Sequence, residues 1–208
     1  MKILMVDVDG VLVHGRPADG LPLFTYLERD LGLSAPLLQQ EFFKPYWVGI
    51  VTGQEPIEPR LTEVLGRIAP HLNAQTLLDY WFENDSRLDR QLLDDLARLK
   101  DKGTLLYLAT NQEHQRAAYL RDVLGLGALF DGMFYSAALG ARKPFSDFFR
   151  LATQEVGAAL DDIGFIDDVE ENILAAKDFG WKALHWTPAS RLADAIDAFT
   201  HRDQATRL

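Results

Sequence analysis

The chain has 208 residues, of which 48% are hydrophobic and 25% are charged, a length that allows one substantial hydrophobic core with a smaller accessory module. Its formal net charge of -10 disfavours nucleic acid and anionic membranes as partners, and the absence of cysteine excludes disulfides, thiolate nucleophiles and cysteine-ligated metals. No apolar run reaches the ~18 residues of a membrane span and no secretory signal is recognisable, so we expect a cytoplasmic protein.

The first predicted element is the apolar run "KILMVDV" at 2–8, which is typical of a strand buried on both faces. Three further runs of this kind follow, at 104–110, 163–168 and 182–186. Between them, segments 88–103 and 169–180 have apolar residues at helical spacing and end at a glycine. Strands that alternate with helices predict an α/β fold, a doubly wound parallel sheet covered by helices on both sides.

Residues 15–87 interrupt this alternation, because their apolar residues recur only at helical spacing. The segment 48–60 is rich in Gly and Pro and predicts a loop between two of these helices. We therefore predict an α/β core formed by 1–14 and 88–208, with an all-helical block at 15–87 inserted after the first strand. The polar tail 201–208 is predicted to fray.

Three of the four predicted strands end in polar residues. They are Asp7 and Asp9 at the end of the first, Thr110 and Asn111 at the end of the second, and Asp167 and Asp168 at the end of the third. In an open parallel sheet the ligand site lies beyond the carboxyl ends of the strands, so these side chains should converge there. Four neighbouring carboxylates cannot all stay ionised without a cation. Mg²⁺ is the favoured cation, since it prefers oxygen ligands and substrate phosphates.

Four short motifs in this order, "DVDGV", "LATN", "RKP" and "FIDD", resemble those of the haloacid dehalogenase-like hydrolase superfamily. The helical block at 15–87 resembles the first class of cap in that superfamily. The resemblance implies a Rossmann-like core in which Asp7 is the nucleophile and Asp9 the general acid and base. It places Thr110, Asn111 and Lys143 at the phosphate, although Asn111 is also a candidate for shaping the loop rather than touching substrate.

The metal ligands implied by the same resemblance are the Asp7 carboxylate, the Asp9 main-chain carbonyl, and Asp167 and Asp168. The implied function is a magnesium-dependent phosphohydrolase that acts on a small phosphorylated metabolite through an aspartyl-phosphate intermediate. Dehalogenases of the superfamily lack the second aspartate, so Asp9 favours phosphoester chemistry.

Two alternatives to this function stay open. A sugar-phosphate phosphomutase of the same superfamily shares every motif. A non-catalytic phospho-acceptor or binding protein, such as a receiver domain, also combines clustered carboxylates with a Thr and a Lys. The helical insertion and the late position of "FIDD" disfavour a receiver, because neither fits the order of its motifs.

The helical block is rich in aromatic residues, which we expect to form its core or the face that closes over the sheet. They include Phe42, Phe43, Tyr46 and Trp47. Two cations, Arg142 beside Lys143 and Lys44 among the aromatic residues, are weaker candidates for contact with substrate.

Overall fold

The computed structural model describes residues 1–205 and contains one five-stranded sheet in the order β3-β2-β1-β4-β5, with every neighbouring pair parallel. The strands are β1 (Ile3–Val6), β2 (Leu105–Thr110), β3 (Gly132–Tyr135), β4 (Ile163–Asp167) and β5 (Lys182–His185). The predicted doubly wound α/β class is confirmed. The frayed tail was predicted for 201–208. Residues 201–205 continue the last helix, and 206–208 lie outside the described residues.

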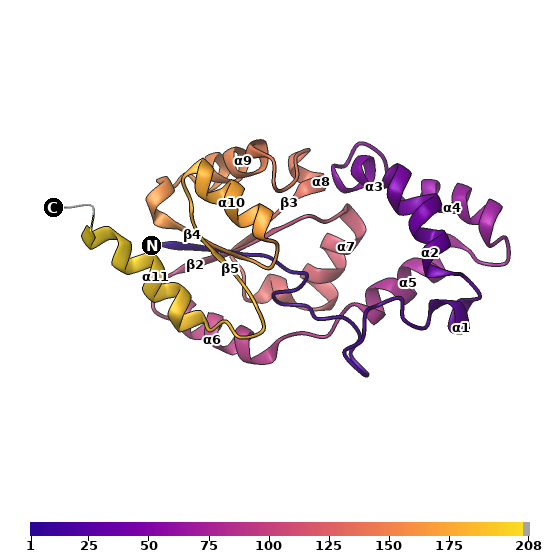
Figure 1. Cartoon of the computed structure of the whole chain (residues 1–208), viewed down its shortest axis with the longest axis horizontal. Helices are drawn as coiled ribbons and strands as arrows, with labels where there is room; N and C mark the ends of the chain where they lie inside the picture. The colour runs from indigo at the N-terminus through magenta and orange to yellow at the C-terminus, as the bar shows by residue number, and fades with distance from the viewer. Residues whose placement is uncertain (206–208) are drawn as a thin grey trace.

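Helices cover both faces of this sheet, as Figure 1 shows. Along β1, Ile3 and Met5 pack under α9 (Ser146–Val156) and α10 (Glu170–Phe179). Leu4 and Val6 pack on the opposite side with α6 (Arg90–Lys100), α11 (Leu192–Ala205) and the π-helical turn at Tyr119–Val123 that follows α7 (His114–Ala118). Burial on both faces explains why these strands lack polar alternation.

The prediction of four strands was incomplete, because β3 at one edge of the sheet was missed. This strand is only four residues long, and Phe134 is its one fully buried residue. So short and half-exposed a segment carries neither a continuous apolar run nor a clear alternation. Short 3-10 turns at Leu126–Ala128 and Leu160–Asp162 precede β3 and β4.

Five helices form the separate block on the right of Figure 1, and they share a hydrophobic cluster of their own. They are α1 (Leu27–Leu31), α2 (Ala35–Leu38), α3 (Lys44–Val51), α4 (Ile57–Ile68) and α5 (Ala74–Asn84), with a π-helical turn at Gln39–Phe43. The predicted loop at 48–60 was wrong in extent, because only 52–56 connect α3 to α4. Pro59 lies in the first turn of α4, where a proline breaks no helical hydrogen bond.

The chain crosses twice between the sheet core and the helical block, and the two crossings pair with each other. The amide of His14 donates to the Arg87 carbonyl at 2.9 Å, and the amide of Arg87 donates to the Gly15 carbonyl at 3.1 Å. The buried Arg116 forms an ion pair with Asp85 at 3.3 Å and donates to the Phe82 carbonyl. The connection between the sheet core and the helical block therefore combines backbone hydrogen bonds with the buried ion pair of Arg116 and Asp85.

A second contact between the two regions lies at α8 (Ser136–Leu139). The Ser136 hydroxyl donates to the carbonyl of Val51 at the end of α3, over 2.5 Å. Gly53, at φ +72°, lies so close to α8 that an added Cβ would be 2.3 Å from the Ala137 carbonyl oxygen. None of the helices in the described part of the chain is both long and apolar enough to cross a bilayer.

Candidate active site

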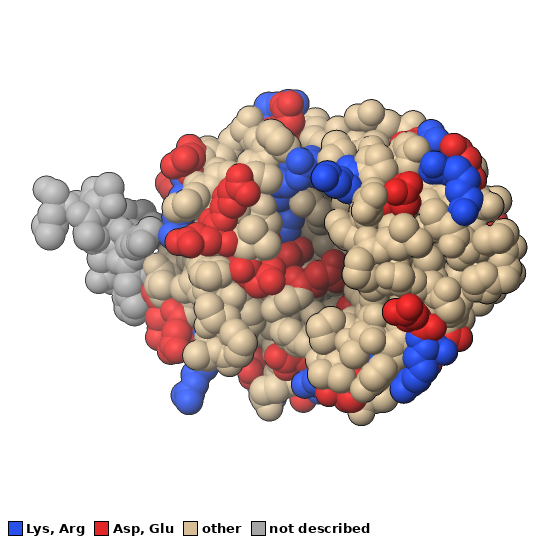
Figure 2. All heavy atoms as spheres, turned by 45° about the vertical axis from the view of Figure 1, so that its right-hand side comes forward, with Lys and Arg blue, Asp and Glu red and all other residues tan. Residues whose placement is uncertain are grey.

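The sheet reverses its winding at β1, because the chain places β2 and β3 on one side of this strand and β4 and β5 on the other. Ligand sites in open α/β sheets lie beyond the carboxyl ends of the strands at such a point. Figure 2 shows a hollow between the sheet core and the helical block, with acidic side chains gathered on the core side and a mostly uncharged wall on the block side.

Lys143 lies at the centre of the buried charges at this edge, with a side chain that is only 1% exposed. Its ammonium is 2.9 Å from Asp7 Oδ1 and 2.5 Å from Asp167 Oδ2, and it also donates to the Ala109 carbonyl at 2.8 Å. Two carboxylates and one ammonium leave a net negative charge out of contact with water. Such a cluster is held together by its own pairing.

The pKa values of the cluster reflect this burial. Burial raises the pKa of Asp7 to about 7, with Lys143 opposing the rise and the charges of Asp167 and Asp9 adding to it. Burial works against the Lys143 ammonium, but Asp7 and Asp167 outweigh it and hold its pKa above the ordinary value. Burial and the neighbouring Asp167 also raise the pKa of Asp168. Burial therefore disfavours the ionised forms of Asp7 and Asp168, although Lys143 partly offsets this effect.

The two acidic residues after β4 are held in different ways. The buried Asp167 accepts hydrogen bonds from the amide of Val169 at 2.8 Å and from the side chain of Asn172 at 3.0 Å. Asp168 is partly exposed and rests against Gly10. Gly10 has φ +79°, and an added Cβ would be 2.0 Å from Asp168 Oδ2, so only glycine allows this approach.

Three carboxylates converge closely enough to share one cation. One oxygen from each of Asp7, Asp167 and Asp168 lies within 4.8 Å of the others. All of these donors are hard oxygen ligands, and three carboxylates at this separation need positive charge between them to stay ionised. The residues present therefore fit a small divalent cation such as Mg²⁺.

The residues after β2 lie beside this cluster. Thr110 is buried at the end of the strand, where its hydroxyl lies 3.4 Å from the side-chain nitrogen of Gln112. The Asn111 amide forms two hydrogen bonds with the backbone of Lys143, one to its carbonyl at 3.0 Å and one from its N–H at 2.9 Å. The structure thus places Asn111 where it shapes the loop that carries Lys143.

Asp9 lies beyond the end of β1 and is exposed, whereas Asp7 is buried. Its Oδ2 accepts a hydrogen bond of 2.7 Å from Gln112. The structure thus brings together Asp7, Asp9, Thr110, Asn111, Lys143, Asp167 and Asp168 at one edge of the sheet.

Sequence reasoning missed two polar residues of this site, Gln112 and Asn172. Gln112 directly follows Thr110 and Asn111, so its place after a predicted strand was an available signal. Asn172 lies in the first turn of α10, where no spacing rule singles it out.

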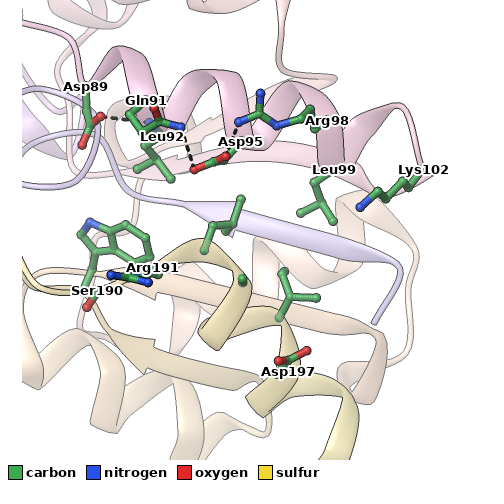
Figure 3. A pocket seen from close by; sticks show the side chains of 14 residues that line it. Asp89, Gln91, Leu92, Asp95, Arg98, Leu99, Lys102, Ser190, Arg191 and Asp197 are labelled. Carbon is green, nitrogen blue, oxygen red and sulfur yellow. Dashed lines mark hydrogen bonds and ion pairs between the residues drawn. The ribbon is translucent and has the colours of Figure 1, made fainter.

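A separate groove lies between α6 and α11, away from these carboxylates (Figure 3). Its lining includes Leu92, Leu99, Leu192 and Ile196, with charged residues such as Arg98 at its rim. It contains none of the strand-end residues predicted for chemistry, so the hollow between the core and the helical block is the candidate active site.

Comparisons with known proteins agree with this geometry. The model of one family, described as haloacid dehalogenase-like hydrolase, matches residues 1–180. The chain is 34% identical over 101 residues to a sesquiterpene phosphatase of Aspergillus oryzae, an alignment that covers 49% of the chain and 52% of that relative. The chain therefore spans only about half the length of this relative.

A more extended match is to a phosphoglycolate phosphatase of Pectobacterium atrosepticum, with 24% identity over 207 residues, 93% of the chain and 83% of the relative. Among solved structures, a magnesium complex of an enzyme from Bacteroides thetaiotaomicron superposes with a TM-score of 0.78 at 16% identity. That superposition covers 94% of the chain and 98% of the other, which establishes a shared fold over almost the whole molecule.

Proposed function

The chain belongs to the haloacid dehalogenase-like hydrolase family, and from this premise we propose that it is a magnesium-dependent phosphatase of a small phosphorylated metabolite. In this proposal Asp7 carries the phosphoryl group as an aspartyl-phosphate. The named activities of two relatives, a sesquiterpene phosphatase and a phosphoglycolate phosphatase, support phosphate ester chemistry. Because the two names point to different substrates, the substrate itself is left to experiment.

One observation carries the proposal: the Asp7 carboxylate is held in place by Lys143 and lies beside two further carboxylates that could bind a cation. Lys143 fixes its Oδ1 at 2.9 Å, and oxygens of Asp167 and Asp168 lie within 4.8 Å. A phosphoryl group brought to this point would meet an ammonium and the buried hydroxyl of Thr110, both of which can donate to its oxygens. A divalent cation bound by the three carboxylates would neutralise further negative charge on the phosphoryl group.

In the first step, a carboxylate oxygen of Asp7 attacks phosphorus as the bond from phosphorus to the leaving oxygen breaks. Asp9 gives its proton to that oxygen, and the alcohol departs neutral. In the second step, the Asp9 carboxylate takes a proton from a water molecule whose oxygen attacks phosphorus. The bond to Asp7 breaks, inorganic phosphate leaves, and both aspartates return to their starting states.

We further propose that residues 15–87 act as a cap over this site, with the core formed by 1–14 and 88–208. The helical block has its own hydrophobic cluster and faces the strand ends across the hollow of Figure 2. It joins the core through the paired crossings at Gly15 and Arg87, a narrow connection that suits a hinge. A cap in this position would exclude bulk water during phosphoryl transfer.

The proposed function is tested by phosphate release from a panel of sugar phosphates, nucleotides, phosphoglycolate and sesquiterpenyl phosphates, with Mg²⁺ or with a chelator. We expect release from a few of these substrates, dependent on Mg²⁺ and absent in Asp7→Asn. Retained turnover in Asp7→Asn would overturn the assignment of the nucleophile.

Product analysis on the same panel addresses the alternatives. An isomeric sugar phosphate in place of free phosphate would identify a phosphomutase. Neither product with any substrate would contradict a catalytic function and favour a phospho-acceptor or binding protein.

A further inference from the structure

Gln112 connects two residues of the candidate active site through one side chain. It follows β2, and only 3% of its surface is exposed. Its side-chain nitrogen donates to Asp9 Oδ2 at 2.7 Å and lies 3.4 Å from Thr110 Oγ1. An amide nitrogen only donates hydrogen bonds, so Asp9 Oδ2 is the acceptor in this contact.

We propose that Gln112 is the positioning residue that holds the Asp9 carboxylate ready for proton transfer. The inference rests on the proposed function, since it assigns Gln112 a role through Asp9. Asp9 is exposed and lies beyond the last residue of β1, so the strand ladder does not fix its side chain. Among the side chains of residues 1–200, the amide of Gln112 is the one hydrogen-bond donor to that carboxylate.

In this contact the two carboxyl oxygens of Asp9 have different roles. Oδ2 is occupied by Gln112, which leaves Oδ1 to face the leaving group. A fixed carboxylate spends less time in unproductive orientations, and misplacement of a reacting group by about 1 Å can cost ~100-fold in rate. The amide is neutral, so it can orient Asp9 without adding a further charge to the crowded cluster.

The second N–H of the same amide points towards the hydroxyl of Thr110. A hydroxyl that accepts a hydrogen bond keeps its own proton free for another partner. Thr110 can then donate that proton to a phosphoryl oxygen. Gln112 thus holds two side chains in a fixed arrangement. Asp9 gives a proton to the leaving group, and Thr110 donates a hydrogen bond to the phosphoryl group.

The backbone of Gln112 is itself fixed at the contact between the sheet core and the helical block. Its carbonyl accepts a hydrogen bond of 3.2 Å from the amide of Ala137 in α8. On the other side of α8, Gly53 of the helical block packs against the Ala137 carbonyl. The backbone that carries Gln112 is therefore held by a hydrogen bond from α8.

The test compares two leaving groups. p-Nitrophenolate leaves without a proton, whereas an alkoxide must be protonated. For Gln112→Ala with Mg²⁺ present, we expect kcat/KM for an alkyl phosphate to fall ~10-fold further than kcat/KM for p-nitrophenyl phosphate. This ratio reports the first step, in which Asp9 donates a proton only to a leaving oxygen that needs one, and not the later attack of water, which is the same for both substrates. The KM values should change much less than kcat. Asp9→Asn should show the same pattern more strongly.

Gln75→Ala is the matched control, because Gln75 donates to Asp79 at the same 2.7 Å on the exposed face of α5. It should leave both rates unchanged. Gln112→Glu keeps the size of the side chain but turns a carboxylate towards Asp9, so it should reproduce the leaving-group pattern without creating a cavity.

Two outcomes overturn the inference in distinguishable ways. An equal loss for both leaving groups in Gln112→Ala and Gln112→Glu, or no loss in either variant, overturns the role of Gln112 alone. No phosphate release by the wild-type protein from any substrate overturns the proposed function and this inference with it.

Discussion

The sheet core and the helical block differ in what they bury. Among residues 1–200, eleven polar or charged side chains are buried, and only Arg16 and Thr52 of these belong to the block. The other nine belong to the core: Asp7, Thr110, Gln112, Glu113, Arg116, Ser136, Lys143, Asp167 and Asn172. Burial of a charge costs free energy unless a partner compensates it. In the core, several of these buried groups lie at the strand ends, where the chemistry is expected.

Aromatic rings pack in both regions, as at Phe149 and Trp181 of the core, but in the helical block they pack with few buried polar groups beside them. Phe43, Trp47 and Trp81 have ring centroids 5.4–5.6 Å apart, and most of these contacts are edge-on or tilted. Trp81 also contacts Phe82, and the ring of Phe82 contacts that of Tyr119 in the core, with 5.4 Å between the two centroids. A volume-conserving swap of one apolar side chain usually costs less than ~1.5 kcal/mol, whereas loss of one partner from a buried ion pair costs ~3–5 kcal/mol. The core therefore depends on each member of its site, whereas the block can vary its surface and keep its fold.

Removal of one buried charge from the core should produce the largest effect. Lys143→Met leaves Asp7 and Asp167 facing each other without the ammonium that lies 2.9 and 2.5 Å from them. We expect a loss of about 3–5 kcal/mol in the free energy of unfolding at pH 8 without Mg²⁺, as for other broken buried pairs. Turnover should be lost as well. Urea unfolding and phosphate release measure the two effects.

Arg60 supplies the matched position in the helical block, because it also lies between two carboxylates. It is 2.9 Å from Glu55 and 2.6 Å from Glu63, but its side chain is 30% exposed. Arg60→Met should cost less than ~1 kcal/mol, since exposed ion pairs contribute little. Equal losses at the two positions would refute the contrast between the two regions.

The raised pKa of the buried Asp7 should also make the free energy of unfolding depend on pH. Because the pKa of Asp7 is raised to about 7, the folded protein binds a proton more tightly than the unfolded chain between pH 4 and 7. In chelator, the free energy of unfolding should therefore fall by about 2–4 kcal/mol as pH rises through this window, at ~1.4 kcal/mol per pKa unit. Mg²⁺ should shrink or reverse this fall, because a cation stabilises the ionised carboxylate.

Asp7→Asn is the control for this pH dependence, since Asn carries no charge at any pH. A shallower fall should remain in the variant, because burial and Asp9 raise the pKa of Asp85 to about 6. Chemical unfolding at several pH values, with and without Mg²⁺, gives both curves. A wild-type curve that rises between pH 4 and 7 in chelator would contradict the described charge balance.

The sequence predicted that Asp7, Thr110 and Asp167 gather at one edge of the sheet, because strand ends are visible as apolar runs that stop at polar residues. Each of these three residues ends such a run, and parallel strands bring their ends to one edge. The missed strand β3 has one fully buried residue and so lacked this signal. The contact between Gln112 and Asp9 joins residues 103 positions apart, and no local pattern encodes its geometry.

In the helical block, the sequence indicated helices but not their limits or their contacts. Proline and glycine suggested a loop over 48–60, whereas α3 and α4 continue into that segment from both sides. The approach of Gly53 to α8 depends on how the block rests on the core. Such an approach is set by packing between distant segments, so helical periodicity cannot reveal it.

Substitution of Gly53 tests the contact between the two regions, with a smaller expected effect. An alanine there must adopt a positive φ, which costs about 1–2 kcal/mol, and its Cβ would also press on the Ala137 carbonyl. We expect Gly53→Ala to lower both the free energy of unfolding and kcat/KM, because the helical block can no longer rest on α8. Urea unfolding and steady-state kinetics measure these changes.

Gly125→Ala separates the two causes, because Gly125 has nearly the same φ, +76° against +72°, with nothing within 4 Å of an added Cβ. This control should show the backbone cost alone and leave kcat/KM unchanged. The difference between the two variants then measures the contact of Gly53 with α8. Equal losses of stability, with kcat/KM unchanged in both, would mean that the block does not rest on α8 in solution.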